Sequence, residues 1–185
     1  MTITQDHIRD TALEYGDAHP EEKPVLAPLL ELLDQNAPIT SRKEFRGHVT
    51  AGAVLVNEAG NVLFVLHKAI GKWLTPGGHL EAEDANLMGA AFRELVEETG
   101  IHASVTPVLP TPVHIDVHPI DANEDKGEPE HQHFDFRYLF RTAGALADDL
   151  DLQAEEVSGY AWRSVDTLSD ERLRNRVATA LRSRV

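Results

Sequence analysis

Apolar side chains follow two different periods along the chain, and the change between them divides it into two parts. In the first part, four leucines recur at the i, i+3, i+4 and i+7 positions of one helix face: Leu26, Leu29, Leu30 and Leu33. This spacing predicts an amphipathic helix that ends near Pro38, preceded by a shorter helix over about 5–15. We expect the leucine stripe to pack onto the rest of the protein; the alternative is a dimer contact.

From about His48 onward the apolar residues form the short runs and alternations that are typical of β-strands. Strands are predicted at 49–56, 62–66, 105–109, 113–117, 133–141 and through 159–163, and helices at 85–98 and 169–182. In the strand at 133–141 the period is two, which places four aromatic side chains on one face: Phe134, Phe136, Tyr138 and Phe140. Acidic loops are predicted at 121–130 and 148–151.

The helix predicted at 85–98 carries three carboxylates on one face. Glu94, Glu97 and Glu98 have i, i+3 and i+4 spacing and are therefore neighbours on the helix surface. They would repel one another without a cation among them, and a hard divalent cation with oxygen ligands suits them. Gly77 and Gly78 precede this helix and allow the backbone to approach the carboxylates closely. Together these features predict a metal site.

The segment 77–101 resembles the signature of the Nudix hydrolases, which reads Gly, five residues, Glu, seven residues, Arg-Glu-aliphatic-any-Glu-Glu-any-Gly-aliphatic. The second half matches at every fixed position: Arg93, Glu94, Leu95, Glu97, Glu98, Gly100 and Ile101. In the first half, Asp84 occupies the position of the first glutamate, and eight residues separate it from Arg93 instead of seven. We expect Asp84 to cap the helix; the alternative is that it takes the role of the first glutamate.

The resemblance covers about residues 45–180 and implies a fold and an activity. The implied fold is an α/β/α sandwich with a mixed β-sheet at 45–185, extended by an N-terminal helical region at 1–44. The implied activity is Mg²⁺-dependent hydrolysis, with Mn²⁺ as a possible substitute, of a phosphoanhydride bond in a nucleoside diphosphate derivative. The alternative is a catalytically silent Nudix-like domain that binds a nucleotide as a sensor. An isomerase of the isopentenyl diphosphate type needs a cysteine, and the chain has none.

The resemblance also implies roles for individual residues. Glu94 and Glu98 are the leading metal ligands, with Glu97 sharing a second ion, and the general base is left open between Glu94 and Glu97. Arg93 is expected to pair with a signature carboxylate and orient it. Two further ligand candidates are the Gly77 carbonyl and Glu156, which lies in an acidic segment before the last strand.

A group of histidines forms a second candidate site outside the signature. His131, His133 and Asp135 are spaced two residues apart, so a strand through them would place all three side chains on one face. We expect the two histidines to flank the substrate pocket. The alternatives are a histidine-based metal site, which would need tetrahedral convergence of the ligands, and histidines with only structural roles.

The net charge and the cysteine content of the chain restrict the partners and the chemistry that can be expected. With 31 acidic and 17 basic residues the formal charge is −14, which disfavours binding to a nucleic-acid backbone. The absence of cysteine excludes disulfides, thiolate metal sites and a cysteine nucleophile.

No apolar run approaches the roughly 18 residues of a membrane helix, and the polar first residues do not resemble a signal peptide. We expect a cytoplasmic protein and a small-molecule substrate, and a homodimer is left open. Sugar nucleotides, oxidised nucleoside triphosphates and dinucleoside polyphosphates are all open as substrates.

Overall fold

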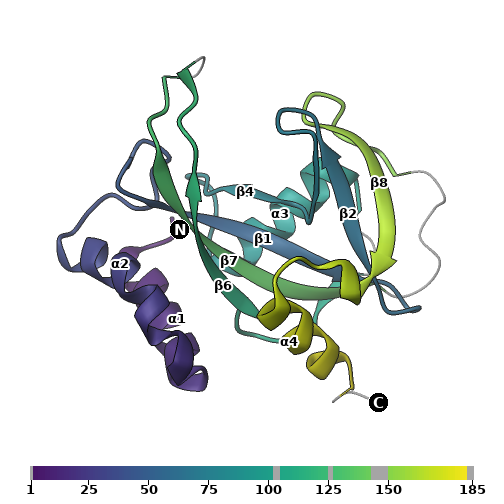
Figure 1. Ribbon diagram of the computed structural model, residues 1–185, viewed down its shortest axis with the longest axis horizontal. Coiled ribbons are helices and arrows are strands. Elements are labelled where there is room, and N and C mark those ends of the chain that lie inside the picture. Colours follow the sequence, from purple (N-terminus) through teal and green to yellow (C-terminus); the bar gives the residue numbers. More distant parts are fainter. Residues whose placement is uncertain (1, 102–104, 125–126, 143–149, 183–185) are drawn as a thin grey trace.

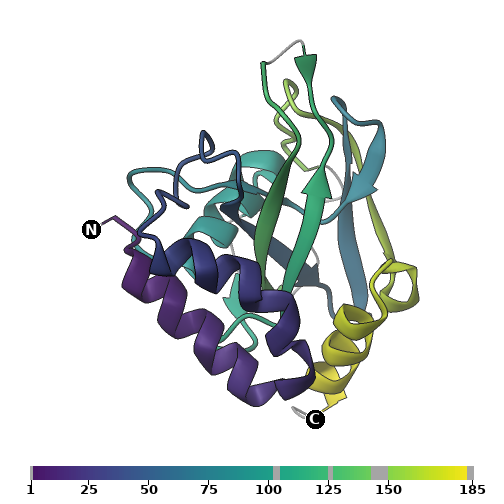
Figure 2. The same cartoon turned by 60° about the vertical axis from the view of Figure 1, so that its left-hand side comes forward.

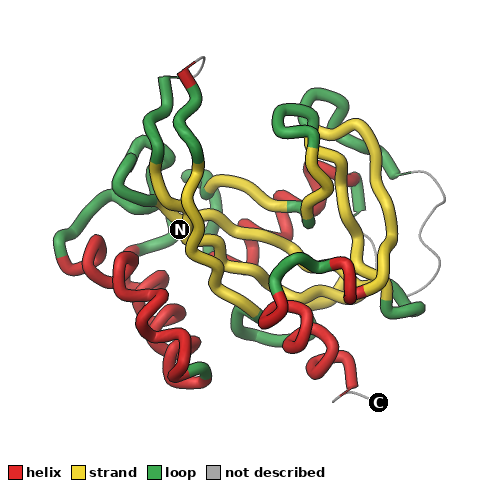
Figure 3. Tube along the Cα trace, viewed as in Figure 1, coloured by secondary structure: helices red, strands yellow, loops and turns green. Residues whose placement is uncertain are grey.

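The computed structural model describes residues 2–101, 105–124, 127–142 and 150–182. Two helices, α1 (Gln5–Ala18) and α2 (Lys23–Asp34), come first and are joined by a 3-10 turn at Pro20–Glu22. Most of the described elements that follow are strands, with α-helices inserted among them and near the C-terminal end and a 3-10 turn at Val165–Thr167 (Figures 1 and 3). None of the described helices has the length and apolar character needed to cross a bilayer.

A mixed sheet occupies the centre of the molecule, and the structure describes eight strands in it. In chain order they are β1 (His48–Val56), β2 (Asn61–His67), β3 (Lys72–Leu74), β4 (Gly77–His79), β5 (Val105–Pro107), β6 (His114–Ile120), β7 (His131–Thr142) and β8 (Val157–Ser164). β1 and β7 pair in parallel, whereas the other pairs described are antiparallel. The predicted mixed sheet is therefore confirmed.

Two helices cover opposite faces of this sheet. In Figure 1, α3 (Leu87–Thr99) lies behind β1, and α4 (Glu171–Arg182) lies in front of the sheet. Because both faces are covered, every residue of β1 is buried. Ala53 and Phe136 belong to the core that contains α3, whereas Val54 and Leu139 pack with α4. The α/β/α sandwich is thus confirmed.

The N-terminal helices pack onto the sandwich, as the leucine stripe predicted. Leu26, Leu29 and Leu33 are buried, and they share one core with the aromatic residues of β7. Figure 2 shows α1 and α2 side by side at one edge of the molecule. The division of the chain at residues 44 and 45 stays a prediction.

The ends of the two sandwich helices differ in part from expectation. Asn86, not Asp84, is the N-cap of α3, and its side chain accepts a hydrogen bond from the Gly89 N–H at 2.8 Å. The predicted cap at Asp84 is therefore wrong, because the extra residue of the signature moves the start of the helix to Leu87. Gly100 ends α3 with a φ of 69°, as predicted. The loops predicted at 121–130 and 148–151 lie partly outside the described residues.

Candidate active site

The glycine pair brings strand β4 close to both β1 and α3. Gly77 pairs with Gly52, and a Cβ added at Gly77 would lie 2.8 Å from the Cα of Gly52. A Cβ added at Gly78 would lie 2.6 Å from a carboxylate oxygen of Glu94. Neither position has room for a side chain, so the two glycines allow the backbone and the Glu94 carboxylate to lie side by side.

Arg93 joins the first and second halves of the signature. Its Nε and Nη2 donate to the two carboxylate oxygens of Asp84, both at 3.0 Å. Its Nη1 donates to Glu94 at 3.0 Å and to Glu97 at 2.7 Å, and Nη2 also donates to the His79 carbonyl at 2.9 Å. The hydrogen bonds with Asp84, together with the neighbouring Glu94 charge, raise the pKa of Arg93. The expected pairing of Arg93 with signature carboxylates is confirmed.

Glu94 and Glu98 are buried carboxylates. Burial raises the pKa of Glu94 to about 7, although the adjacent Arg93 opposes this shift. Burial also raises the pKa of Glu98 to about 8, and the negative charges of Glu94 and Glu156 add to that effect. Glu98 is 2% exposed, and its Oε2 has no hydrogen-bond partner among the described residues. A buried acceptor without a partner costs free energy unless a proton or a cation satisfies it.

Three side chains that could hold a metal ion converge at the Glu98 carboxylate. Ligand atoms of His67, Glu98 and Glu156 lie within 4.8 Å of one another. The backbone of Gly77 also hydrogen-bonds Glu98. Glu97 is half-exposed and turned to Arg93. The structure thus brings Glu98, Glu156 and the Gly77 backbone together, and the Glu94 carboxylate is near enough to act electrostatically on Glu98. Glu97 instead pairs with Arg93.

Sequence reasoning missed His67. This residue ends β2, where it pairs with Val157 of β8, and Val157 directly follows Glu156. A histidine at the end of a predicted strand carries no functional signal by itself. Only the antiparallel pairing of β2 with β8, two segments far apart in the sequence, brings His67 to the signature carboxylates.

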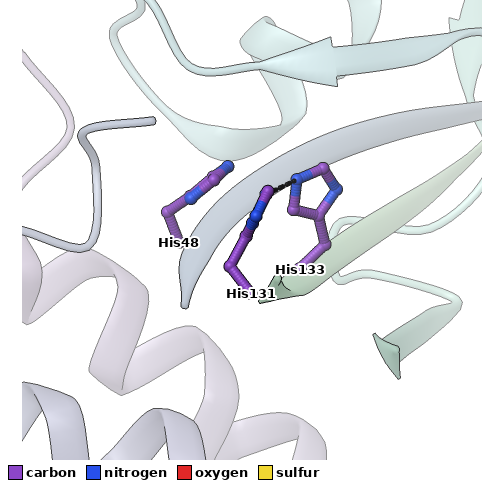
Figure 4. A group of neighbouring side chains, drawn as sticks. All are labelled: His48, His131 and His133. Atoms are coloured by element: carbon purple, nitrogen blue, oxygen red, sulfur yellow. Dashed lines mark hydrogen bonds between the residues drawn. The ribbon is translucent and has the colours of Figure 1, made fainter. Parts of the chain in front are cut away.

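The histidines of the sheet strands outside the carboxylate group lie in two places. His131 and His133 lie together with His48 (Figure 4). The His79 ring is adjacent to that of His48, and the His118 ring is adjacent to that of His133. Burial lowers the pKa of His133 to about 2 and that of His79 to about 4, so these rings are neutral at neutral pH. His114 lies elsewhere, against Tyr15 of α1 at 3.1 Å.

Comparisons with known proteins agree with this geometry. The NUDIX domain model matches residues 46–183. The chain is 34% identical over 126 residues to the "Probable DHNTP pyrophosphohydrolase" of Lactococcus lactis subsp. cremoris (strain MG1363), covering 64% of this chain and 69% of that protein. It is 51% identical over 61 residues to "Phosphatase NudJ" of Escherichia coli (strain K12), covering 32% of this chain and 39% of that protein.

Solved structures support the fold. An Ap4A hydrolase from C. elegans, in a binary complex, superimposes with a TM-score of 0.53 at 19% identity, covering 73% of this chain and 98% of that one. A NUDIX family hydrolase from Clostridium perfringens gives a TM-score of 0.52 at 23% identity, covering 74% and 97%. At these identities the similarity concerns the fold alone.

The sandwich and the signature helix define an enzyme that acts on acid anhydrides. More narrowly, the chain belongs to the Nudix family, and it is a pyrophosphohydrolase that acts on phosphoanhydride bonds of nucleotide-type small molecules. Members of this family typically need a divalent metal ion.

Proposed function

We propose that this protein is a Mg²⁺-dependent hydrolase, able to use Mn²⁺, that cleaves the pyrophosphate linkage of a nucleoside diphosphate derivative. The observation that carries the proposal is the buried Glu98 carboxylate: its Oε2 has no hydrogen-bond partner among the described residues, and one of its oxygens lies within 4.8 Å of ligand atoms of Glu156 and His67. A buried carboxylate beside other carboxylates is costly in the metal-free protein and becomes favourable when a cation is bound.

The residues present fit such an ion. Glu98, Glu156 and Glu94 supply carboxylate oxygens, and the Gly77 carbonyl is a further candidate; oxygen donors suit Mg²⁺ and Mn²⁺. Imidazole is a less suitable ligand for Mg²⁺, so we assign the ligand role to the carboxylates and not to His67. A bound divalent cation supplies charge neutralisation for the pyrophosphate oxygens.

The remaining signature residues position and activate water. Arg93 holds both Glu94 and Glu97 by its Nη1, and the general base is one of these two glutamates. Because the same arginine is fixed by Asp84, the carboxylate that accepts the proton from water is held in one place. Such fixed geometry is the main protein contribution to an in-line displacement of this kind.

The substrate pocket is proposed to lie on the side of β4 where the histidines gather. His79 of β4 lies next to His133, with ring centroids 5.4 Å apart, and its carbonyl accepts from Arg93. This proximity to the signature supports a substrate contact for His131 and His133. A homodimer and a cytoplasmic location stay predictions.

The proposal is tested by measuring hydrolysis of a substrate panel with and without Mg²⁺. The panel contains sugar nucleotides, oxidised nucleoside triphosphates and dinucleoside polyphosphates, together with the DHNTP named for the Lactococcus relative. We expect metal-dependent turnover of a nucleoside diphosphate derivative, with products identified by mass. Full turnover in excess chelator, after the metal has been removed, would contradict the metal mechanism. Turnover of DHNTP alone would contradict the proposed substrate class.

A further inference from the structure

A trio of histidines lies apart from the carboxylate group described above, and the catalytic proposal leaves its shared geometry unexplained. His48 is the first residue of β1, and His131 and His133 are the first and third residues of β7. His48 is the direct register partner of His133 in the parallel pairing of the two strands. Ligand nitrogens of all three side chains lie within 4.8 Å of one another, as Figure 4 shows for the ring positions.

The outer nitrogen of two of these rings is already held by the backbone. Nδ1 of His48 lies 3.2 Å from the Glu44 carbonyl oxygen, and Nδ1 of His131 lies 2.7 Å from the Pro129 carbonyl oxygen. A carbonyl only accepts, so each Nδ1 carries the proton and each Nε2 keeps its lone pair. Metal-binding histidines are typically oriented in this way by a carbonyl on the second nitrogen.

The Nε2 nitrogens that face one another in the trio are placed to act as metal ligands. His48 is 1% exposed, and its Nε2 is buried without a hydrogen-bond partner among the described residues. Nε2 of His131 lies 3.2 Å from Nε2 of His133. Two nitrogens bound to one tetrahedral ion at about 2.0–2.1 Å lie about 3.3 Å apart, so this pair already has the spacing of two ligands of a single ion.

We propose that Nε2 of His48, His131 and His133 form a binding site for a borderline transition-metal ion, specifically Zn²⁺. Imidazole nitrogens suit Zn²⁺ and do not suit Mg²⁺. In the metal-free form, the 3.2 Å contact is a hydrogen bond in which the Nε2–H of His133 donates to His131. Binding needs the other neutral tautomer of His133, with the proton on Nδ1, and releases no proton.

The site differs in kind from the carboxylate group at Glu98. It has three nitrogen ligands and no carboxylate, and three protein ligands leave the fourth tetrahedral position for water or for an anionic group. Burial keeps the pKa of His48 and His133 below the ordinary value, so protons do not compete for these nitrogens at neutral pH. The proposed contact of His131 and His133 with substrate would then pass through the ion.

The test is a calorimetric titration of the metal-stripped full chain with Zn²⁺, carried out in a large excess of Mg²⁺. The magnesium occupies hard oxygen sites and leaves imidazole sites available. We expect one Zn²⁺ per chain. His48→Gln and His133→Gln should each weaken binding by more than the roughly 10–100-fold that loss of an outer-shell partner costs. The matched control His67→Gln removes the imidazole of the other group and should leave Zn²⁺ affinity unchanged.

A spectroscopic readout keeps the proposal testable if a variant fails to fold. In the unmodified protein, two-bond ¹H–¹⁵N spectra of the imidazoles should show Nε2 of three histidines shifting when Zn²⁺ is added. Co²⁺ bound in place of Zn²⁺ should give the visible absorption of a tetrahedral nitrogen-ligated ion. Absence of saturable Zn²⁺ binding in excess Mg²⁺ overturns the proposal. So does binding that survives in both trio variants and is lost in His67→Gln. Catalytic turnover is not part of this test, so its outcome is independent of the proposed function.

Discussion

Asp84 and Arg93 form a bidentate ion pair in which Nε and Nη2 of the arginine each lie 3.0 Å from one carboxylate oxygen. The Asp84 carboxylate also accepts from the Glu81 backbone N–H at 2.7 Å, and the residue is 6% exposed. Because two donors match two acceptors, the guanidinium is held in one orientation. Its remaining nitrogen reaches Glu94 and Glu97, so Asp84 positions these two carboxylates through the arginine.

Replacing Asp84 by Asn should therefore reduce both stability and activity. Asn has one acceptor oxygen where Asp has two, replaces the other by an NH2 donor and lacks the charge, so we expect a loss of about 1.5–3 kcal/mol in the free energy of unfolding. Turnover at saturating Mg²⁺ should also fall, because Arg93 no longer holds Glu94 and Glu97 in place. Urea unfolding and steady-state rates measure the two effects. A variant as stable and active as the natural protein would contradict this role.

The matched control for Asp84 is Asn86, the residue that caps α3. Asn86→Ala removes the 2.8 Å bond from the Gly89 N–H and should cost about 1 kcal/mol of stability. Its turnover in the folded fraction should remain that of the natural protein, because none of the hydrogen bonds and ion pairs described for Arg93 involves Asn86. The two variants thus separate capping from carboxylate positioning.

Glu98→Gln should lower turnover strongly without unfolding the protein. The amide preserves the size of the side chain and removes the charge that a hard cation needs. We expect turnover to fall by orders of magnitude and the stabilisation on adding Mg²⁺ to shrink. In chelator above about pH 8, where Glu98 is ionised, the variant should be at least as stable as the natural protein, because a buried charge without a partner is removed. Near-natural turnover at saturating Mg²⁺ would show that Glu98 is not a ligand.

Two adjacent glutamates test the ligand role proposed for Glu156. Glu156 lies with Glu98 and His67, whereas the exposed Glu155 does not belong to that group. Glu156→Gln should raise the Mg²⁺ concentration needed for half-maximal turnover, and Glu155→Gln should leave it unchanged. Both substitutions remove one surface charge, so a general electrostatic effect would appear equally in both. Equal shifts in the two variants would remove Glu156 from the ligand set.

The parts of this structure that local patterns encode could be predicted from the sequence. The period-two aromatics of β7, the leucine stripe of α2 and the cap at Gly100 depend on neighbours in the chain. The carboxylates of the signature could be placed on one helix face for the same reason. The pairing of Asp84 with Arg93 was harder to predict, because an Asp just before a helix is equally compatible with an N-cap. The structure distinguishes the two roles, because Asn86 caps α3 and Asp84 pairs with Arg93.

Other site residues depend on contacts between distant segments. His67 meets Glu98 only because β2 pairs with β8, and His48 meets His133 only because β1 pairs in parallel with β7. Strand pairing of this kind is fixed by the packing of the whole sheet, and it cannot be predicted from the spacing of apolar residues within one segment. The histidine trio could thus be predicted only in part, as two histidines on one strand face.

A buried ion pair joins the N-terminal helices to α4, and its loss should destabilise the protein. Glu22 is 1% exposed; it accepts from the Tyr15 hydroxyl at 2.6 Å and from Arg176. Burial opposes the charge of Glu22, but these hydrogen bonds outweigh it and lower the pKa. Glu22→Gln should cost about 1.5–3 kcal/mol near pH 7. The cost should diminish as the pH falls below the ordinary glutamate range, where the native carboxylate is protonated too. A cost that is independent of pH would indicate packing alone.

The stability of the metal-free protein should fall as the pH rises from about 4.5 to about 8, the interval between the ordinary and the folded-state pKa values of Glu98. Burial also raises the pKa of Glu94 to about 7. Within this interval the folded protein binds more protons at the two glutamates than the unfolded chain does. Their contribution is therefore fully present below the unfolded pKa and is lost as the pH passes through the folded values.

Thermal unfolding of the chelator-treated protein across this interval measures the effect, and Glu98→Gln isolates it. Gln does not titrate, so the variant should lose less stability than the natural protein between pH 5 and pH 8, a window chosen inside the titration range of raised carboxylates. Adding Mg²⁺ to the natural protein should reverse the loss at the upper end, because a bound cation favours the ionised carboxylates. Parallel pH profiles for the natural protein and Glu98→Gln would contradict a buried, unpaired carboxylate at this position.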